Sequence, residues 1–217
     1  EIARLDPVIT ALAGDGVPLS IDAFRLETQR YALGRGVAYI NDILGFPDPA
    51  LYPKLKAASC RLVVMHAVQR ETRARQVDLA ADEVWRRIEA FFAGRIAVLA
   101  SVGISRDRLI LDPGMGFFLS TRADASLRVL AGLARLKIAF GLPVMISVSR
   151  KSFLAALTGR PNPAERGAAT LAAELYAAAQ GADYIRTHDA AALRDALTVT
   201  AALEDEAARL PTRHSIT

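Results

Sequence analysis

Six short apolar runs, each ending in a polar residue and followed by a longer helical stretch, set the strongest limit on what this chain can fold into. The runs lie at residues 17–22, 38–42, 61–66, 108–112, 144–149 and 184–188. They are rich in β-branched residues and too short for buried helices, so we expect strands. Because nearly every residue within a run is apolar, both faces of each strand should be covered, which is typical of parallel strands.

The segments between the runs show helical periodicity. The clearest is residues 78–102, where Val84, Ile88 and Phe92 recur on one broad face. We expect further helices at residues 1–15, 127–138, 149–158, 163–180 and 190–209. Residues 211–217 should form a flexible tail after a single domain at residues 1–210.

Repeated strand-helix units predict a parallel α/β fold, either an open sheet or a closed barrel. No Gly-x-Gly-x-x-Gly follows any strand, which weakens the dinucleotide-binding form of the open sheet. In a barrel, polar residues at the carboxyl ends of the strands converge on one site. Here those residues are Asp22, Asn41, Asp42, His66, Asp112, Ser149 and His188. We therefore predict a (β/α)8 TIM barrel with about six of its eight units in this chain, and expect the two missing units to precede residue 1.

Composition excludes several classes of protein. Hydrophobic residues make up 52% of the 217 residues, which argues against general disorder. No uncharged apolar run reaches about 18 residues, so no membrane span is expected. The net charge is only +4 and the basic residues are scattered, so nucleic-acid binding is not predicted. A single cysteine, Cys60, fits a reducing cytoplasm.

The segment Ser149-Arg150-Lys151-Ser152 leads from an apolar strand through a turn with two cations into a helix. Free backbone N–H groups at the helix start, together with Ser152 and Lys151, could hold a carboxylate or a phosphate. The competing interpretation is ordinary helix capping with solvated cations.

Three further strand ends carry acidic or amide side chains. Asp112 is followed by a glycine-rich loop that places Phe117 beside the expected barrel mouth. Asp22 and Asn41 end two other strands, and a carboxylate facing adjacent ring N–H and amino groups accepts two hydrogen bonds at once. This combination suits a flat aminopyrimidinone-type heterocycle. The alternative is that these side chains cap neighbouring turns and helices.

The last strand ends in Arg186-Thr187-His188. Arg186 and His188 should project to the same face because strand side chains alternate. Arginine can stack on a flat ring and bind phosphate, and histidine can bind phosphate or transfer a proton. A purely structural pair remains the alternative. His66 is better explained as a hydrogen-bonded residue at the edge of the core. No cysteine-histidine pattern with zinc spacing and no nucleophile elbow is present in the sequence.

Taken together, six stretches resemble the dihydropteroate synthases in order and spacing. They are Ser20-Ile21-Asp22, Ile40-Asn41-Asp42-Ile43, Val64-Met65-His66, Leu111-Asp112-Pro113-Gly114-Met115-Gly116-Phe117, Ser149-Arg150-Lys151-Ser152-Phe153 and Arg186-Thr187-His188. The resemblance implies a barrel that joins p-aminobenzoate to a dihydropterin-methyl diphosphate and releases pyrophosphate.

The same resemblance implies roles for individual residues. Asp22, Asn41, Asp112, Lys151 and Arg186 would hold the pterin, and Arg186 with His188 would contact the diphosphate. Phe117, Ser149, Arg150 and Ser152 would frame p-aminobenzoate. Lys151, Arg186 and His188 would be catalytic. Mg²⁺ is the implied cofactor, but the family's asparagine ligand lies on a strand absent from this chain, so no metal ligand is assigned here. The family and the Ala-rich segment at residues 168–179 suggest a homodimer, and the single cysteine places it in the cytoplasm.

The sequence at residues 31–48 and 117–119 is most similar to that of the acquired, sulfonamide-insensitive dihydropteroate synthases. Departures from the common pattern occur at Ala23-Phe24-Arg25, Val68 and Ser147, and we expect sulfonamides to be excluded. Two alternatives stay open. One is another pterin-binding barrel, such as a methyltetrahydrofolate methyltransferase, and the other is an inactive, truncated barrel.

Overall fold

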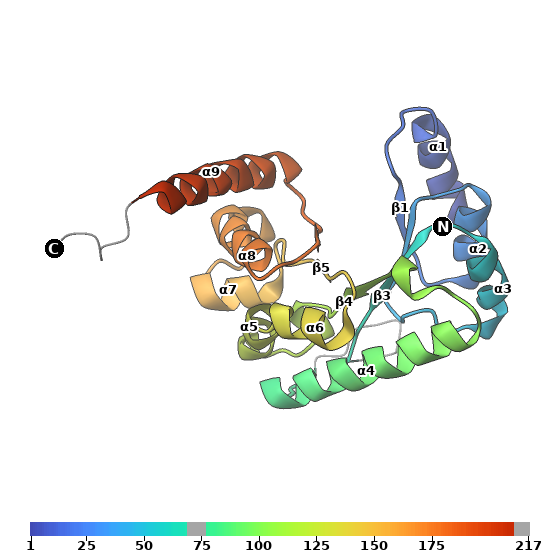
Figure 1. Cartoon of the computed structure of the whole chain (residues 1–217), viewed down its shortest axis with the longest axis horizontal. Helices are drawn as coiled ribbons and strands as arrows, with labels where there is room; N and C mark the ends of the chain where they lie inside the picture. The colour runs from blue at the N-terminus through green and yellow to red at the C-terminus, as the bar shows by residue number, and fades with distance from the viewer. Residues whose placement is uncertain (69–76, 211–217) are drawn as a thin grey trace.

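A wall of parallel strands forms the centre of the molecule. The computed structural model describes residues 1–68 and 77–210 (Figure 1). The strands are β1 (Ser20–Asp22), β2 (Tyr39–Asp42), β3 (Arg61–Met65), β4 (Leu109–Asp112), β5 (Met145–Ile146) and β6 (Tyr184–Ile185). Strands β1 to β4 form one sheet in chain order, and β5 pairs with β6. A parallel bridge between Leu111 and Val144 joins the two sheets, so the wall runs from β1 to β6 in sequence order.

The helices follow the strands in regular alternation. They are α1 (Ile2–Leu12), α2 (Leu26–Gly34), α3 (Tyr52–Ala57), α4 (Ala81–Ser101), α5 (Ala123–Ala131), α6 (Leu133–Phe140), α7 (Ser152–Thr158), α8 (Gly167–Ala179) and α9 (Ala190–Arg209). Single turns of 3₁₀ helix lie at Pro49–Leu51, Arg106–Arg108, Gly116–Phe118 and Pro163–Glu165.

The wall curves so that its last strand approaches its first ones. Near the amino ends of the strands, Nη1 of Arg61 donates a hydrogen bond of 2.7 Å to the hydroxyl of Tyr184, and the rings of Tyr39 and Tyr184 meet edge to face. At the opposite end, Arg186 reaches Asp22. This curvature is that of a partial (β/α) barrel, as the sequence predicted.

The strands occupy the predicted runs but are shorter. The ladder of β5 starts late because the N–H of Val144 donates to the carboxylate of Asp183 at 2.8 Å instead of to a strand carbonyl. Helix α2 was not predicted because the residues it buries include Thr28 and Gln29, so it lacks an apolar stripe. The short helix α3 was also missed. The predicted tail, residues 211–217, lies outside the described residues.

The core lies on both faces of the strands. Leu62, Val63 and Val64 of β3 are all fully buried, so neighbouring residues that point in opposite directions are both covered. Helix α4 buries Ile88 and Phe92 on its inner face. Burying each such side chain contributes about 1.5–3 kcal/mol relative to leaving it exposed. The predicted coverage of both strand faces is confirmed.

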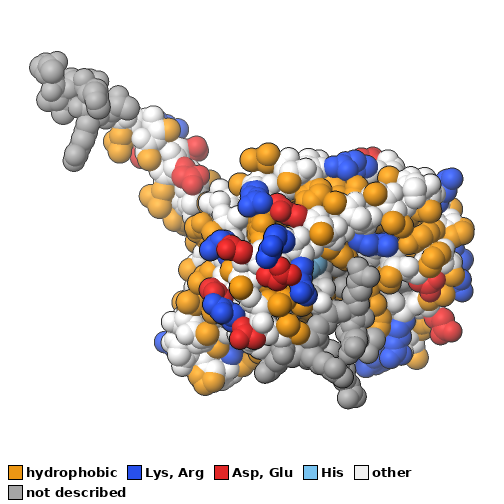
Figure 2. Space-filling model, turned by 90° about the horizontal axis from the view of Figure 1, so that it is seen from below, with side chains coloured by type: hydrophobic (Ala, Val, Ile, Leu, Met, Phe, Trp, Pro, Cys, Tyr) orange, Lys and Arg blue, Asp and Glu red, His pale blue; other side chains and the backbone are white. Residues whose placement is uncertain are grey.

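Charges of both signs are mixed on the surface. Figure 2 shows lysine and arginine side chains interspersed with acidic ones, with hydrophobic side chains between them. No stripe of a single charge sign stands out on the described part of this face. Within residues 1–68 and 77–210, no helix combines the length and apolar character needed to cross a bilayer.

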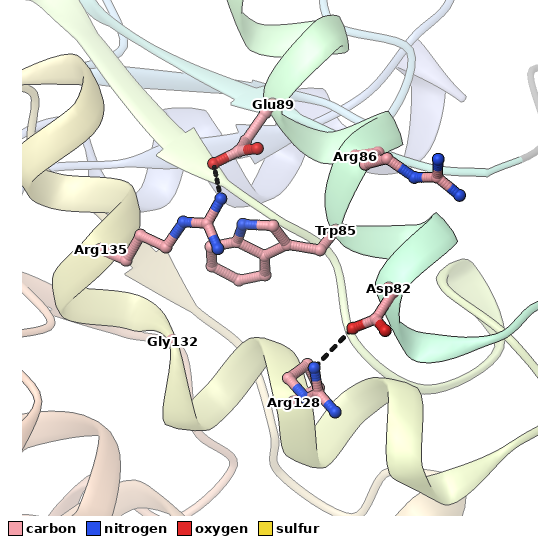
Figure 3. A pocket seen from close by; sticks show the side chains of 7 residues that line it. All are labelled: Asp82, Trp85, Arg86, Glu89, Arg128, Gly132 and Arg135. Atoms are coloured by element: carbon pink, nitrogen blue, oxygen red, sulfur yellow. Dashed lines mark hydrogen bonds and ion pairs between the residues drawn. The ribbon is translucent and has the colours of Figure 1, made fainter.

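The predicted helix at residues 127–138 is divided into α5 and α6 at Gly132. Trp85 of α4 lies against this junction (Figure 3). A Cβ at Gly132 would be only 2.7 Å from Cη2 of Trp85, so the indole requires glycine here. Two ion pairs tie α4 to the same junction: Glu89 with Arg135 at 2.8 Å and Asp82 with Arg128 at 2.5 Å.

Candidate active site

The carboxyl ends of β1 and β2 place a carboxylate beside an amide. Asp22 and Asn41 are partners in the ladder between these strands. Asn41 is 3% exposed, and its Oδ1 is buried with no hydrogen-bond partner. Buried polar atoms are normally paired, so this oxygen is available to a ligand donor at the barrel mouth.

Asp42, the next residue, has a structural role. Its carboxylate accepts hydrogen bonds from Nε2 of Gln29 at 2.8 Å, from the N–H of Leu44 at 2.8 Å and from the N–H of Phe46 at 3.0 Å. Burial raises the pKa of Asp42, and these three donors act against that rise. The capping interpretation therefore applies to Asp42. Since side chains alternate along a strand, Asn41 points to the opposite side of the sheet, into the barrel.

Asp112 at the end of β4 is 2% exposed and accepts one hydrogen bond, 2.8 Å, from the N–H of Gly114. Burial raises its pKa to about 6, while the Gly114 bond and the positive charges of Lys151 and Arg186 lower it and the negative charge of Asp22 raises it. The charges of four predicted site residues therefore interact at the barrel mouth: Asp22, Asp112, Lys151 and Arg186.

The loop after Asp112 depends on Gly114. Its φ is +73°, and a Cβ there would lie 2.4 Å from the carbonyl oxygen of His66. The ring of His66 is itself buried, with Nδ1 3.2 Å from the carbonyl oxygen of Pro113. The sequence-based interpretation of His66 as a core-edge residue is confirmed.

Lys151 approaches the same basin from the turn after β5. Burial lowers its pKa, and the negative charges of Asp112 and Asp22 counteract that shift. Its Nζ lies 4.9 Å from the centroid of the Phe118 ring. The aromatic ring in contact with the lysine is thus Phe118, which the sequence analysis did not single out, whereas Phe117 is 49% exposed.

The turn at residues 149–152 is held by groups that sequence reasoning missed. Arg150 adopts φ of +59°, its N–H donates to Oγ1 of Thr170 at 3.0 Å, and its carbonyl accepts from Nη1 of Arg166 at 2.7 Å. Arg166 is 6% exposed and also donates to the carbonyls of Arg160 and Pro161. Nothing in the sequence marks Arg166, because only the tertiary structure brings those carbonyls together.

Helix α7 follows this turn. It begins at Ser152, is seven residues long and has no side-chain cap. Lys151 and Arg150 give the turn before it two positive charges. Helix α7 packs against the turn Gly116–Phe118, which places Ser152 on the helix adjoining the aromatic loop.

His188 is oriented by Ser149. Oγ of Ser149 lies 2.8 Å from Nδ1 of His188 and accepts the His188 N–H at 3.3 Å. Ser149 is 5% exposed while His188 is exposed. The structure therefore joins Ser149, which the family resemblance placed at p-aminobenzoate, to a residue that it placed at the diphosphate.

Metal ligands are scarce in the described part of the chain. Residues 1–68 and 77–210 contain no group of three or more His, Cys, Asp or Glu side chains that could hold a metal ion. The described side chains therefore do not form a Mg²⁺ site by themselves.

Comparison with known proteins identifies the family. The model of the pterin-binding enzyme family matches residues 1–188. The chain is 57% identical to the type-2 dihydropteroate synthase of Escherichia coli, covering 95% of this chain and 76% of that protein. It is 53% identical to a type-1 dihydropteroate synthase of Escherichia coli, covering 94% and 73%.

A solved structure agrees with this assignment. The dihydropteroate synthase of Xanthomonas albilineans in complex with 7,8-dihydropteroate superposes with a TM-score of 0.83 at 35% identity, covering 97% of this chain and 77% of that one. Family match, sequence identity and fold agree, and the chain belongs to the dihydropteroate synthases of the pterin-binding enzyme family.

Proposed function

We propose that the site at the carboxyl ends of the strands condenses p-aminobenzoate with 6-hydroxymethyl-7,8-dihydropterin diphosphate. The products are dihydropteroate and pyrophosphate. The observation that carries the proposal is that two buried groups at the strand ends keep acceptor atoms free for a ligand, Oδ1 of Asn41 and the carboxyl of Asp112. They suit the edge of an aminopyrimidinone ring, whose ring N–H and amino groups donate hydrogen bonds.

The pterin lies in the basin bounded by Asp22, Asn41, Asp112 and Lys151. Ionised Asp112 accepts hydrogen bonds from a ring N–H and the neighbouring amino group. Lys151 donates to an acceptor atom of the ring. Arg186 lies where its planar guanidinium can stack on the ring and also face the diphosphate.

The reaction breaks the bond between the pterin methylene carbon and the diphosphate oxygen. The amine nitrogen of p-aminobenzoate forms the new bond to that carbon and then loses a proton. Arg186 and His188 stabilise the charge that develops on the leaving diphosphate. No covalent intermediate with the protein is needed, so catalysis consists of positioning and electrostatic stabilisation.

Mg²⁺ is the cofactor expected from the family resemblance. It would neutralise diphosphate charge, and in phosphate sites most of its ligands are waters and substrate oxygens. None of the steps above depends on a metal ligand from the described residues.

p-Aminobenzoate approaches between the aromatic loop and the turn at Ser149–Ser152. Phe117 and Ser152 lie on packed elements, α7 and the turn Gly116–Phe118. The N–H of Val68 donates to the carbonyl of Phe118 at 2.9 Å, so the backbone of one residue that departs from the common family pattern lies beside this loop. We propose that the departures at this end of the site admit the small planar carboxylate and exclude the bulkier tetrahedral sulfonamide group.

The sulfonamide proposal has a direct test. We expect the Ki of sulfamethoxazole to exceed the KM for p-aminobenzoate by at least about tenfold, or roughly 1.4 kcal/mol of discrimination. A Ki close to that KM contradicts the proposal.

We further propose that the chain forms a homodimer through the groove between α5, α7 and α8. The groove measures about 470 Å³ and includes Leu127, Leu157 and Tyr176, each at least 40% exposed. The small alanine side chains of α8 allow close approach of a second copy about a two-fold axis. Light scattering should give twice the chain mass, and Leu157→Glu should give one chain mass. A monomeric wild-type chain rules the dimer out.

The experiment that tests the central proposal is a turnover assay of the chain with both substrates. Pyrophosphate release should depend on both, and mass spectrometry should identify dihydropteroate in equal amount. Lack of turnover by folded protein supports the inactive-barrel alternative. Methyl transfer that requires a cobalamin protein supports the methyltransferase alternative.

A further inference from the structure

Glu174 of α8 carries a buried carboxyl group that the mechanism above does not use. It is 1% exposed, and its Oε1 has no hydrogen-bond partner among the described residues. Burying a polar group without a partner is costly. The buried, unpartnered carboxyl oxygen of Glu174 therefore needs an explanation other than packing.

The carboxyl borders a cavity that is also lined by Ser149 and His188. The cavity, of about 250 Å³, is formed between α8, the turn after β5 and the turn after β6. Its polar lining includes Ser149, Arg150, Thr170, Thr187 and His188. The space is large and polar enough to hold water that would satisfy Oε1.

Glu174 is connected to the end of β6 through Thr187. Thr187 and Glu174 line the same cavity, the Thr187 hydroxyl lies close enough to the Glu174 carboxyl to lower its pKa, and Oγ1 of Thr187 accepts the N–H of Asp189 at 3.1 Å. A hydroxyl can donate one bond and accept another, so both contacts can exist together. Thr187 lies between Arg186 and His188 in the chain, just beyond the end of β6.

The charges around Glu174 come from each neighbouring element. Asp189 at the start of α9 adds a negative charge, and Arg150 and His188 also line the cavity. Burial and Asp189 raise the pKa of Glu174, whereas the Thr187 hydroxyl lowers it.

We infer that Glu174 is a positioning residue that holds Thr187 and thereby fixes the strand end from which Arg186 and His188 meet the diphosphate. The inference rests on the proposed function, in which those two residues contact the diphosphate. Glu174 itself touches no substrate.

Steady-state kinetics with each substrate varied in turn tests the inference. Glu174→Ala should raise the KM for the pterin diphosphate by about fivefold or more, and leave the KM for p-aminobenzoate within about twofold, because the displacement affects one end of the site. Glu174→Gln keeps an acceptor for Thr187 and should stay close to wild type. Glu204→Gln, an exposed carboxyl on α9, is the matched control and should change neither KM.

A double-variant cycle with Thr187→Val separates positioning from a general structural effect. If Glu174 acts through Thr187, Glu174→Ala combined with Thr187→Val should be no worse than Thr187→Val alone. The inference is overturned if the effects of the two substitutions on KM multiply in the double variant. It is also overturned if Glu174→Ala raises the KM values for both substrates equally. If Glu174→Ala fails to fold, Thr187→Val alone must reproduce the selective KM increase, and a normal KM in that variant also overturns it.

Arg186→Ala, assayed in parallel, distinguishes a failure of the proposed function from a failure of the positioning role of Glu174. A normal KM for the pterin diphosphate in this variant contradicts the proposed function itself. An increased KM in Arg186→Ala with a normal KM in Glu174→Ala leaves the proposed function intact and refutes only the positioning role.

Discussion

Arg186, directly after the last strand, and Asp22, at the end of the first strand, meet across the mouth of the barrel, with Nη1 2.6 Å from Oδ2. Both side chains are partly exposed, 55% for Arg186 and 39% for Asp22. Exposed ion pairs contribute about 0–1 kcal/mol to stability. The value of this pair therefore lies in geometry, because it holds the guanidinium over the basin that contains Asp112 and Lys151.

Asp22→Asn should separate the contribution of this ion pair to stability from its role in orienting Arg186. We expect kcat/KM for the pterin diphosphate to fall by about tenfold, since Arg186 loses the partner that orients it, while the free energy of unfolding changes by less than about 1 kcal/mol. Chemical denaturation alongside kinetics checks both values. Full activity in this variant would show that the ion pair does not orient Arg186.

Lys151→Ala and Asp112→Ala should each lower kcat/KM by at least about tenfold, or roughly 1.4 kcal/mol of transition-state stabilisation. The reason is that each removes a group that faces the proposed pterin. Lys54→Ala, which removes an exposed lysine from α3, serves as the control and should retain activity. Wild-type rates in both purified site variants refute the assignments.

The raised pKa of Asp112 predicts opposite effects of pH on stability and activity. A carboxyl with a pKa near 3.8 when unfolded and about 6 when folded binds more protons in the folded state between these values. Folding stability should therefore fall as pH rises from about 4 to 6 and then level off. Activity should rise over the same range, because ionised Asp112 accepts the pterin hydrogen bonds.

Asp112→Asn provides the matched test of this pH dependence. The variant should be more stable than wild type at pH 7 by an amount of order 1–3 kcal/mol, because a buried charge is removed. Its stability should also lose most of the decline between pH 4 and 6. An unchanged profile in denaturation experiments across this pH range contradicts the pKa assignment.

Gly114→Ala should damage the loop that carries the hydrogen bond to Asp112. Gly114 and Gly159 both have positive φ, but only at Gly114 would a Cβ collide with backbone, the carbonyl oxygen of His66. Gly159→Ala should cost about 1–2 kcal/mol from the backbone conformation alone. We expect Gly114→Ala to cost more and to reduce activity, as thermal unfolding and turnover can measure. Equal losses in the two variants would show that the close approach is unimportant.

The candidate site could be predicted in outline because its residues follow apolar runs. Asp22, Asn41, Asp112 and Arg186 are found at strand ends because the carboxyl ends of parallel strands converge. The supporting residues could not be found in this way. Arg166 and Glu174 lie in or beside helices, and their roles depend on carbonyls and hydroxyls that come close only after folding.

The sequence by itself determined the alternation of strands and helices, because a strand covered on both faces must be apolar throughout, as β3 is. Only the tertiary structure decided which of two adjacent polar residues faces the barrel. The alternation rule places Asn41 and Asp42 on opposite sides, but it does not say which side is inward. The answer comes from Gln29 of α2, which binds Asp42 outside the sheet and leaves Asn41 facing the basin.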